Sequence, residues 1–165
     1  MIVAEDSRQQ AGKHRNIHRQ LGAKGHQVVR TKLYVGDYQL INRGDVVVDT
    51  KKDMLELAMD ICRDHKRFSE ECKKAHDAGI RLVILTEELL PTGGLANWKS
   101  PTWKTTTSRH KAGEAISQVK PETLYKAIHT MSTRYGVEFH FCHKDETGDR
   151  IMDILTEPRR EGESV

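Results

Sequence analysis

The sequence has few of the features that mark secreted, zinc-binding or membrane proteins. Its 165 residues include three cysteines, an odd number without a CxxC pair, which favours free thiols over disulfides or a zinc site. The N-terminal segment turns acidic at Glu5 and Asp6, which excludes a signal peptide. No apolar run approaches the roughly 20 residues needed to cross a bilayer. We therefore expect a cytoplasmic protein, in a reducing intracellular compartment, with no membrane partner.

Acidic residues are absent from two long stretches. The formal net charge of +3 is too small to indicate a partner, but residues 8–36 and 97–113 contain basic residues and no Asp or Glu. Arg8 and Arg15 lie in the first stretch, and Lys99 and Lys104 lie in the second. Such stretches are often only solvated surface. A polyanionic ligand such as DNA is the functional alternative.

Hydrophobic periodicity predicts an α/β fold with a mixed central β-sheet flanked by helices. The predicted strands cover residues 2–5, 28–35, 45–51, 81–86 and 137–142, with a short strand before 42–44. The predicted helices cover residues 10–21, 53–78, 120–135 and 148–155. We expect a single domain over residues 1–157, with a surface loop at about 91–111 and a flexible tail over 158–165.

A predicted hairpin at residues 36–53, GDYQLINRGDVVVDTKKD, brings together residues that can carry chemistry. Asp37 stands at the start of its first strand. Asp49 and Lys51 are two residues apart on the second strand, so both project from one face. Two carboxylates can hold a hard divalent cation, and a nearby lysine can orient a water or a phosphate. Acid pairs near a lysine also occur by chance, but a charged residue directly after the apolar run 46–48 needs a partner or a function.

Three segments resemble known nucleases. EDSRQ at residues 5–9, GDY at 36–38 and VVVDTK at 46–51, before a long helix, are similar to the XPF-type structure-specific endonucleases of the PD-(D/E)xK superfamily. The order of the later strands and helices agrees as well. The resemblance implies a restriction-endonuclease-like nuclease fold and a short, stand-alone nuclease domain.

The resemblance also implies roles for individual residues. Asp37 and Asp49 would bind the metal and, with Lys51, carry catalysis. The backbone carbonyl of Thr50 would complete the inner shell, and Asp6 would be a further ligand or an acid that supports the ligands. The expected cofactor is Mg²⁺ or Mn²⁺, because oxygen ligands suit hard cations.

The site departs from the family pattern at two places. The family's E-R-K is Asp49-Thr50-Lys51 here, and the acid expected four residues after the lysine falls on Leu55. Asp53 and Glu56 flank Leu55, but their spacing is that of a helix cap, which is the simpler interpretation.

Several other residues are candidate DNA contacts. By resemblance, Arg8 would contact phosphate, as would Arg63 or Arg67 on the long helix. Trp98-Lys99 and Trp103-Lys104 repeat a W-K pair in the predicted loop. The tryptophans either stack on bases while the lysines contact phosphates, or fold back and anchor the loop.

The site residues and the resemblance together predict a divalent-metal-dependent DNA endonuclease. The resemblance further implies branched or single-strand/double-strand junction DNA as the substrate and a role in repair or recombination. A homodimer or a protein partner would complement a domain that stands alone. A catalytically weak DNA-binding or scaffolding subunit is the alternative. Another PD-(D/E)xK activity, such as junction resolution, would use the same residues.

Overall fold

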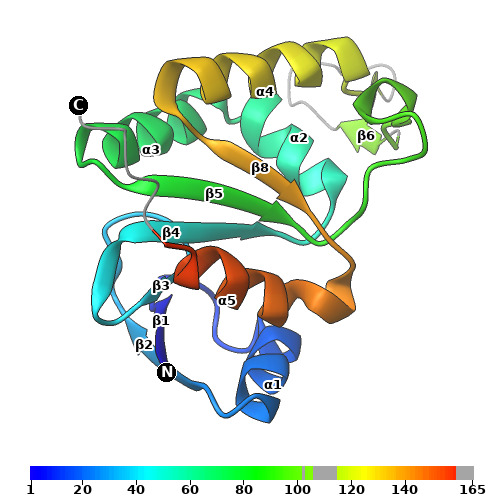
Figure 1. The fold of residues 1–165 in the computed structure, drawn as a ribbon. Helices are drawn as coiled ribbons and strands as arrows, with labels where there is room; N and C mark the ends of the chain where they lie inside the picture. The colour runs from blue at the N-terminus through cyan, green and yellow to red at the C-terminus, as the bar shows by residue number, and fades with distance from the viewer. Residues whose placement is uncertain (102, 106–114, 159–165) are drawn as a thin grey trace.

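A mixed β-sheet between two layers of helices forms the body of the protein. The computed structural model describes residues 1–101, 103–105 and 115–158. The strands are β1 (Ile2–Asp6), β2 (Gln27–Thr31), β3 (Tyr38–Leu40), β4 (Arg43–Lys51), β5 (Arg81–Thr86), β6 (Trp103–Thr105), β7 (Ala115–Ser117) and β8 (Glu138–Phe141). The helices are α1 (Arg15–Ala23), α2 (Met54–Cys62), α3 (His65–Asp77), α4 (Pro121–Tyr135) and α5 (Thr147–Thr156), with short 3-10 turns η1 (Leu95–Asn97) and η2 (Lys144–Glu146). In Figure 1, α2, α3 and α4 cover one face of the sheet and α1 and α5 cover the other, which confirms the predicted fold class.

The order of strands in the main sheet is β2-β1-β3-β4-β5-β8. β1 pairs in parallel with β2, and β4, β5 and β8 are parallel neighbours, whereas β3 runs antiparallel between β1 and β4. In the main sheet, the carboxyl ends of all strands except β3 therefore lie at the same end of the sheet, and β3 begins near that end. This topology brings Asp6, Asp37 and Lys51 to the same region.

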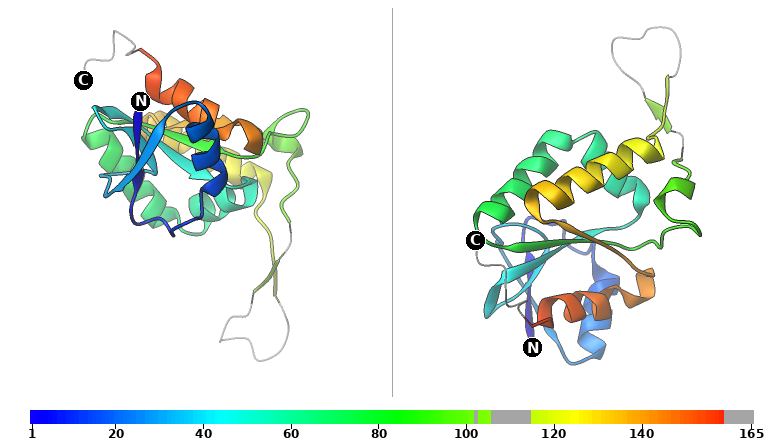
Figure 2. Two further views of the ribbon diagram at one scale, coloured as in Figure 1. Left: turned by 90° about the horizontal axis from the view of Figure 1, so that it is seen from below. Right: turned by 45° about the horizontal axis from the view of Figure 1, so that its top comes forward.

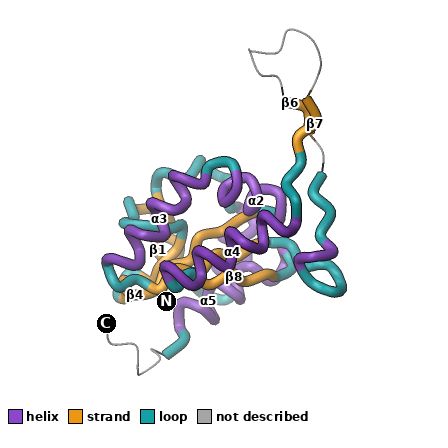
Figure 3. The backbone as a smooth tube through the Cα atoms, turned by 90° about the horizontal axis from the view of Figure 1, so that it is seen from above, coloured by secondary structure: helices purple, strands orange, loops and turns teal. Residues whose placement is uncertain are grey.

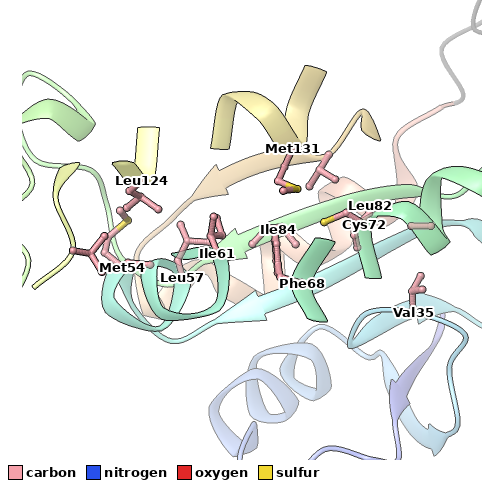
Figure 4. Close-up of a cluster of buried hydrophobic side chains, with 14 of the residues drawn as sticks. Val35, Met54, Leu57, Ile61, Phe68, Cys72, Leu82, Ile84, Leu124 and Met131 are labelled. Atoms are coloured by element: carbon pink, nitrogen blue, oxygen red, sulfur yellow. The ribbon is translucent and has the colours of Figure 1, made fainter. Parts of the chain in front are cut away.

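The two faces of the sheet bury separate apolar clusters. Val47 belongs to the cluster under α2, α3 and α4, whereas Val46 and Val48 belong to the cluster under α1 and α5. Figure 4 shows how side chains of α2, α3 and α4 meet those of β5 in the first cluster. Because side chains alternate along a strand, Asp49 and Lys51 share the face of Val47. Asp49 and Lys51 therefore face the layer that contains α2, whereas the Thr50 side chain lies on the other face.

The helix predicted over residues 53–78 is two helices. α2 ends at Cys62 and α3 begins at His65, which is exposed. No apolar residue occurs between Cys62 and Phe68, so nothing holds this polar stretch against the sheet. Asp64 adopts a non-helical conformation in front of α3, as Asp residues often do at helix starts.

Two other predicted elements are shorter than expected. The strand predicted over 28–35 ends at Thr31, and Leu33 and Val35 are buried from a loop instead. The helix predicted over 10–21 begins at Arg15, after a turn in which Gly12 has φ of 82°. Asp6 does not cap this helix, because its carboxylate accepts bonds from Arg8 and from the Leu33 N–H.

The region predicted as a surface loop contains a two-stranded antiparallel ribbon. β6 and β7 form this ribbon, which projects from the body near η1 and α4 (Figures 2 and 3). Its base is fixed where the Ser100 hydroxyl accepts a bond from the Val119 N–H (3.3 Å). Most of the predicted tail lies outside the described residues. Across the part of the chain that the structure describes, no helix has the length and apolarity to span a membrane.

Candidate active site

The β3–β4 hairpin brings Asp37 beside Asp49. Gly36 precedes Asp37 with φ of 67°, and a Cβ at this position would lie 2.3 Å from Cγ1 of Val47. Only glycine fits both this backbone conformation and this close approach. The Asp37 N–H then donates to the Val48 carbonyl (2.9 Å), which fixes Asp37 against β4.

Three donors orient the Asp37 carboxylate. Its Oδ2 accepts bonds from the Thr50 N–H (2.9 Å) and the Thr50 hydroxyl (2.7 Å). Its Oδ1 accepts a bond from Nε2 of Gln9 at 2.5 Å. Gln9 was not a predicted site residue, although it lies in the EDSRQ segment that carries the family resemblance.

Asp49 is a buried carboxylate next to a second acid. Burial raises the pKa of Asp49 to about 7; the charge of Lys51 opposes this rise and that of Asp37 adds to it. The Lys51 ammonium lies 2.8 Å from Oδ2 of Asp49. A cation between Asp37 and Asp49 would relieve the repulsion that contributes to this raised pKa.

Lys51 is held between two acids, one of which the sequence pattern missed. Its Nζ lies 2.7 Å from Oδ2 of Asp60 on α2. Burial would lower the pKa of Lys51, but the charges of Asp49 and Asp60 outweigh it and raise the pKa above its ordinary value. The two neighbouring acids therefore favour the charged form of Lys51.

The residues of the pair fit a hard divalent cation. Asp37 and Asp49 are both buried and present carboxylate oxygens from the two arms of one hairpin, the kind of ligand that a hard cation takes. In an extended strand the N–H and C=O of one residue point to the same side, so the Thr50 carbonyl faces the side of Asp37. Among the described residues, no three His, Cys, Asp or Glu side chains are grouped to hold a metal. The fit thus depends on the two carboxylates and a backbone oxygen.

Comparison with known families decides the classification. The model of the ERCC4 domain matches residues 6–153. The chain belongs to the ERCC4 domain family.

Solved structures agree with this classification. The fold is similar to that of XPF from Aeropyrum pernix, with a TM-score of 0.60 and 18% identity over 94% of this chain and 63% of that chain. A structure described as XPF from Aeropyrum pernix in complex with DNA matches equally well, with a TM-score of 0.60 and 18% identity over 93% of this chain and 62% of that one. The chain thus spans less than two thirds of the XPF chains that it matches. No curated protein matches it.

Asp6 does not join the carboxylate pair of this ERCC4 domain. Its backbone N–H donates to the Asp37 carbonyl (2.8 Å), but its carboxylate accepts bonds from Nε of Arg8 (2.7 Å) and the Leu33 N–H (3.3 Å). Nη2 of Arg8 donates in turn to the Leu33 carbonyl (3.0 Å). In the structure the Asp6 carboxylate is thus engaged by Arg8 and the Leu33 N–H rather than aimed at the pair, and Asp6 and Arg8 hold the loop that leads to Asp37.

The predicted arginine contacts on α3 and α2 differ in their relation to the site. Arg67 reaches the site, because its Nη2 lies 3.3 Å from Oδ1 of Asp60. Arg63 is exposed at the end of α2, and Arg15 is exposed at the start of α1.

Asp53 caps α2 by accepting a bond from the Glu56 N–H (2.7 Å), which confirms the simpler interpretation of that residue.

The structure distinguishes the two interpretations of the tryptophan loop at one position. Trp98 is 6% exposed and packs in the cluster under α2, α3 and α4, so it anchors the loop and is not available to stack on bases. Lys99 beside it is exposed. The side chains of Trp103 and Lys104 lie outside the described residues, although their backbone forms β6.

The anchoring role of Trp98 predicts a loss of stability. We expect Trp98→Leu to lower the free energy of unfolding by roughly 1–2 kcal/mol, because a smaller side chain leaves space in the cluster. DNA affinity should stay unchanged. Urea denaturation and a DNA-binding titration measure the two effects, with Tyr125→Leu, at a position 61% exposed, as the control. A variant of full stability but weak DNA binding would support base stacking instead.

The contact between Asp60 and Lys51 predicts a loss of activity. We expect Asp60→Asn to slow DNA cleavage on the order of tenfold, since partners that orient an active-site group typically contribute this much. Single-turnover cleavage at saturating metal measures the effect. Asp64→Asn is the control, because it removes the other acid that pairs with Arg67 and leaves the ion pair between Asp60 and Lys51 in place. Equal rates for the two variants would contradict a role for Asp60.

Proposed function

We propose that this ERCC4 domain is a divalent-metal-dependent endonuclease that hydrolyses DNA phosphodiester bonds inside the cell. The observation that carries the proposal is the buried pair of Asp37 and Asp49 with Lys51 beside it on one hairpin. The family match and the likeness to an XPF structure in complex with DNA support DNA as the substrate. By the same resemblance, we propose branched or single-strand/double-strand junction DNA, and a role in repair or recombination.

The residues of the chain would have three roles: to bind the cation, to orient the Asp37 carboxylate and to supply the negative charge that the cation offsets. Mg²⁺ or Mn²⁺ held by Asp37, Asp49 and the Thr50 carbonyl would supply an activated water and a Lewis acid. Gln9 and Thr50 hold the Asp37 carboxylate in one orientation. Both acids contribute negative charge that a cation offsets.

Lys51 suits electrostatic stabilisation rather than proton abstraction. Its raised pKa keeps the ammonium charged, so it has no lone pair with which to act as a base. A fixed ammonium can orient the attacking water and stabilise the negative charge that develops on the phosphate. Arg67, 61% exposed and next to Asp60, would contact an adjacent phosphate.

A cleavage panel tests the proposed function. The protein is incubated with labelled flap, fork, four-way junction and linear DNA, with Mg²⁺, Mn²⁺ or EDTA. We expect metal-dependent cleavage that is abolished in Asp49→Ala and Lys51→Ala. Asp77→Ala and Lys73→Ala, which remove an exposed ion pair on α3, are the matched controls.

The possible outcomes separate the alternatives. Binding without cleavage under any metal would favour the DNA-binding or scaffolding subunit. Cleavage that survives both substitutions would place the chemistry elsewhere in the chain. DNA binding that does not weaken as salt rises would contradict a basic surface as the phosphate contact.

A further inference from the structure

A second polar cluster lies on the opposite face of the sheet from the acid pair. The strand register places Arg30 of β2, Glu5 of β1 and Tyr38 of β3 side by side. Their side chains face α1, and His14 and His18 reach the same place from the segment around the start of that helix. None of these residues takes part in the function proposed above.

Glu5 is the hub of this cluster. Its side chain is 5% exposed, and its Oε1 lies 3.1 Å from the Tyr38 hydroxyl, 3.1 Å from Nδ1 of His14 and 2.9 Å from Nε2 of His18. Its Oε2 lies 3.2 Å from Nε of Arg30. Burial alone would raise the pKa of Glu5, but the hydrogen bonds and charges around it outweigh burial and lower the pKa. Four partners thus hold a buried carboxylate in place.

One route from Glu5 to the acid pair runs through Tyr38. Residues alternate between the faces of a strand, so Tyr38 faces Glu5 while Asp37, its neighbour, faces Thr50. The Tyr38 hydroxyl is fixed by Glu5 and also lies 2.7 Å from Nδ1 of His14. An anchored Tyr38 side chain restrains the backbone that carries the Asp37 carboxylate.

A second route runs through Arg30. Its Nη2 donates to the carbonyl of Ser7 (3.1 Å) and to that of Gln9. The guanidinium that pairs with Glu5 therefore also holds the turn that presents the Gln9 amide to Oδ1 of Asp37. Glu5 is thus linked to the Asp37 carboxylate both through Tyr38 and through Arg30.

We propose that Glu5, with Tyr38 and Arg30, is a positioning network that sets the cation affinity of the Asp37–Asp49 pair from the opposite face of the sheet. The inference rests on the proposed function, because it assumes that this pair binds a divalent cation. None of the three residues touches the cation or DNA. Each acts through the position of Asp37.

Titration of the protein with Mn²⁺ alone, followed by calorimetry, tests the network without DNA. We expect Tyr38→Phe and Arg30→Gln each to raise the dissociation constant for Mn²⁺ on the order of tenfold, the usual cost of losing a residue that orients a ligand. The matched controls are Tyr34→Phe, at an exposed tyrosine, and Arg19→Gln, at an exposed arginine of α1. Both controls should bind Mn²⁺ as the unchanged protein does.

Cleavage kinetics provide the readout that a general loss of structure would not give. In both variants the rate at saturating Mn²⁺ should return to within about threefold of the unchanged protein, while the Mn²⁺ concentration for half-activation rises on the order of tenfold. DNA affinity in EDTA should not change. Arg30 is 37% exposed, so its replacement keeps the test valid if Tyr38→Phe fails to fold.

Two results would overturn the inference, and only the second would also contradict the proposed function. If the unchanged protein binds Mn²⁺ and both folded variants bind it equally well, the network has no positioning role and the proposed function stands. If the unchanged protein binds no Mn²⁺, the metal-dependent function fails together with the inference.

Discussion

Lys51→Met is expected to reduce the rate constant of DNA cleavage by a factor on the order of 10²–10³, the usual cost of removing one preorganised group that stabilises transition-state charge. The reason is that Lys51 is a buried ammonium beside Asp49, with a raised pKa that favours its charged form. Methionine preserves the length and much of the volume of the side chain. Single-turnover cleavage at saturating Mg²⁺ and saturating DNA measures the effect.

The neighbouring lysine supplies the control for this result. Lys52 is exposed and follows Lys51 directly, so Lys52→Met removes the same charge from the protein surface. We expect Lys52→Met to change DNA affinity only slightly and to leave the cleavage step intact. If the two variants cleave DNA at the same rate, Lys51 is not part of the catalytic centre.

Asp49→Asn is expected to abolish cleavage and, at the same time, to stabilise the metal-free protein. Burial and the charge of Asp37 raise the pKa of Asp49 to about 7 from an ordinary value of 3.8. Between these values the folded protein binds a proton that the unfolded chain has lost, so the unchanged protein loses stability as pH rises through this window. Because a tenfold change in an acid dissociation constant corresponds to about 1.4 kcal/mol, asparagine should raise the free energy of unfolding at pH 8 by roughly 2–4 kcal/mol.

Urea denaturation in EDTA at pH 5 and pH 8 measures this effect. The advantage of Asp49→Asn should be larger at pH 8 than at pH 5, and added Mn²⁺ should stabilise the unchanged protein but not the variant. Asp77→Asn is the control, since Lys73 lowers the pKa of this exposed acid and the pH dependence should not resemble that of Asp49. A variant less stable than the unchanged protein at pH 8 would contradict the repulsion between the two acids.

The sequence predicted the parts of the site that lie close together along the chain. Alternation along β4 indicated that Asp49 and Lys51 share a face, and the hairpin turn indicated that Asp37 lies on the adjacent strand. Both predictions depend only on local geometry, and the structure confirms the placement. The turn is shorter and earlier than the predicted 42–44: Leu40 pairs with Arg43, so the turn is residues 41–42 and β4 starts two residues before position 45.

The residues that the sequence did not reveal reach the site from a distance or from a helix. Gln9 contacts Asp37 across 28 positions of the chain, a pairing that periodicity does not encode. Asp60 lies nine positions after Lys51, and its orientation depends on how α2 packs on the sheet. Asp6 lies at the end of β1, but its carboxylate turns toward Arg8 and the Leu33 N–H rather than toward the pair.

The locality of the hairpin has a consequence for how the protein folds. Asp37, Asp49, Lys51 and Asp60 lie within one continuous segment, so little loop-closure entropy opposes their meeting. Glu5 and Gln9 must close much longer loops before they can orient Asp37, and contacts of this kind form more slowly. We therefore expect the like charges of the pair to meet before the distant residues that hold them are in place. Until that happens, the nascent hairpin carries electrostatic repulsion that Lys51, from the same strand, is the first residue able to offset.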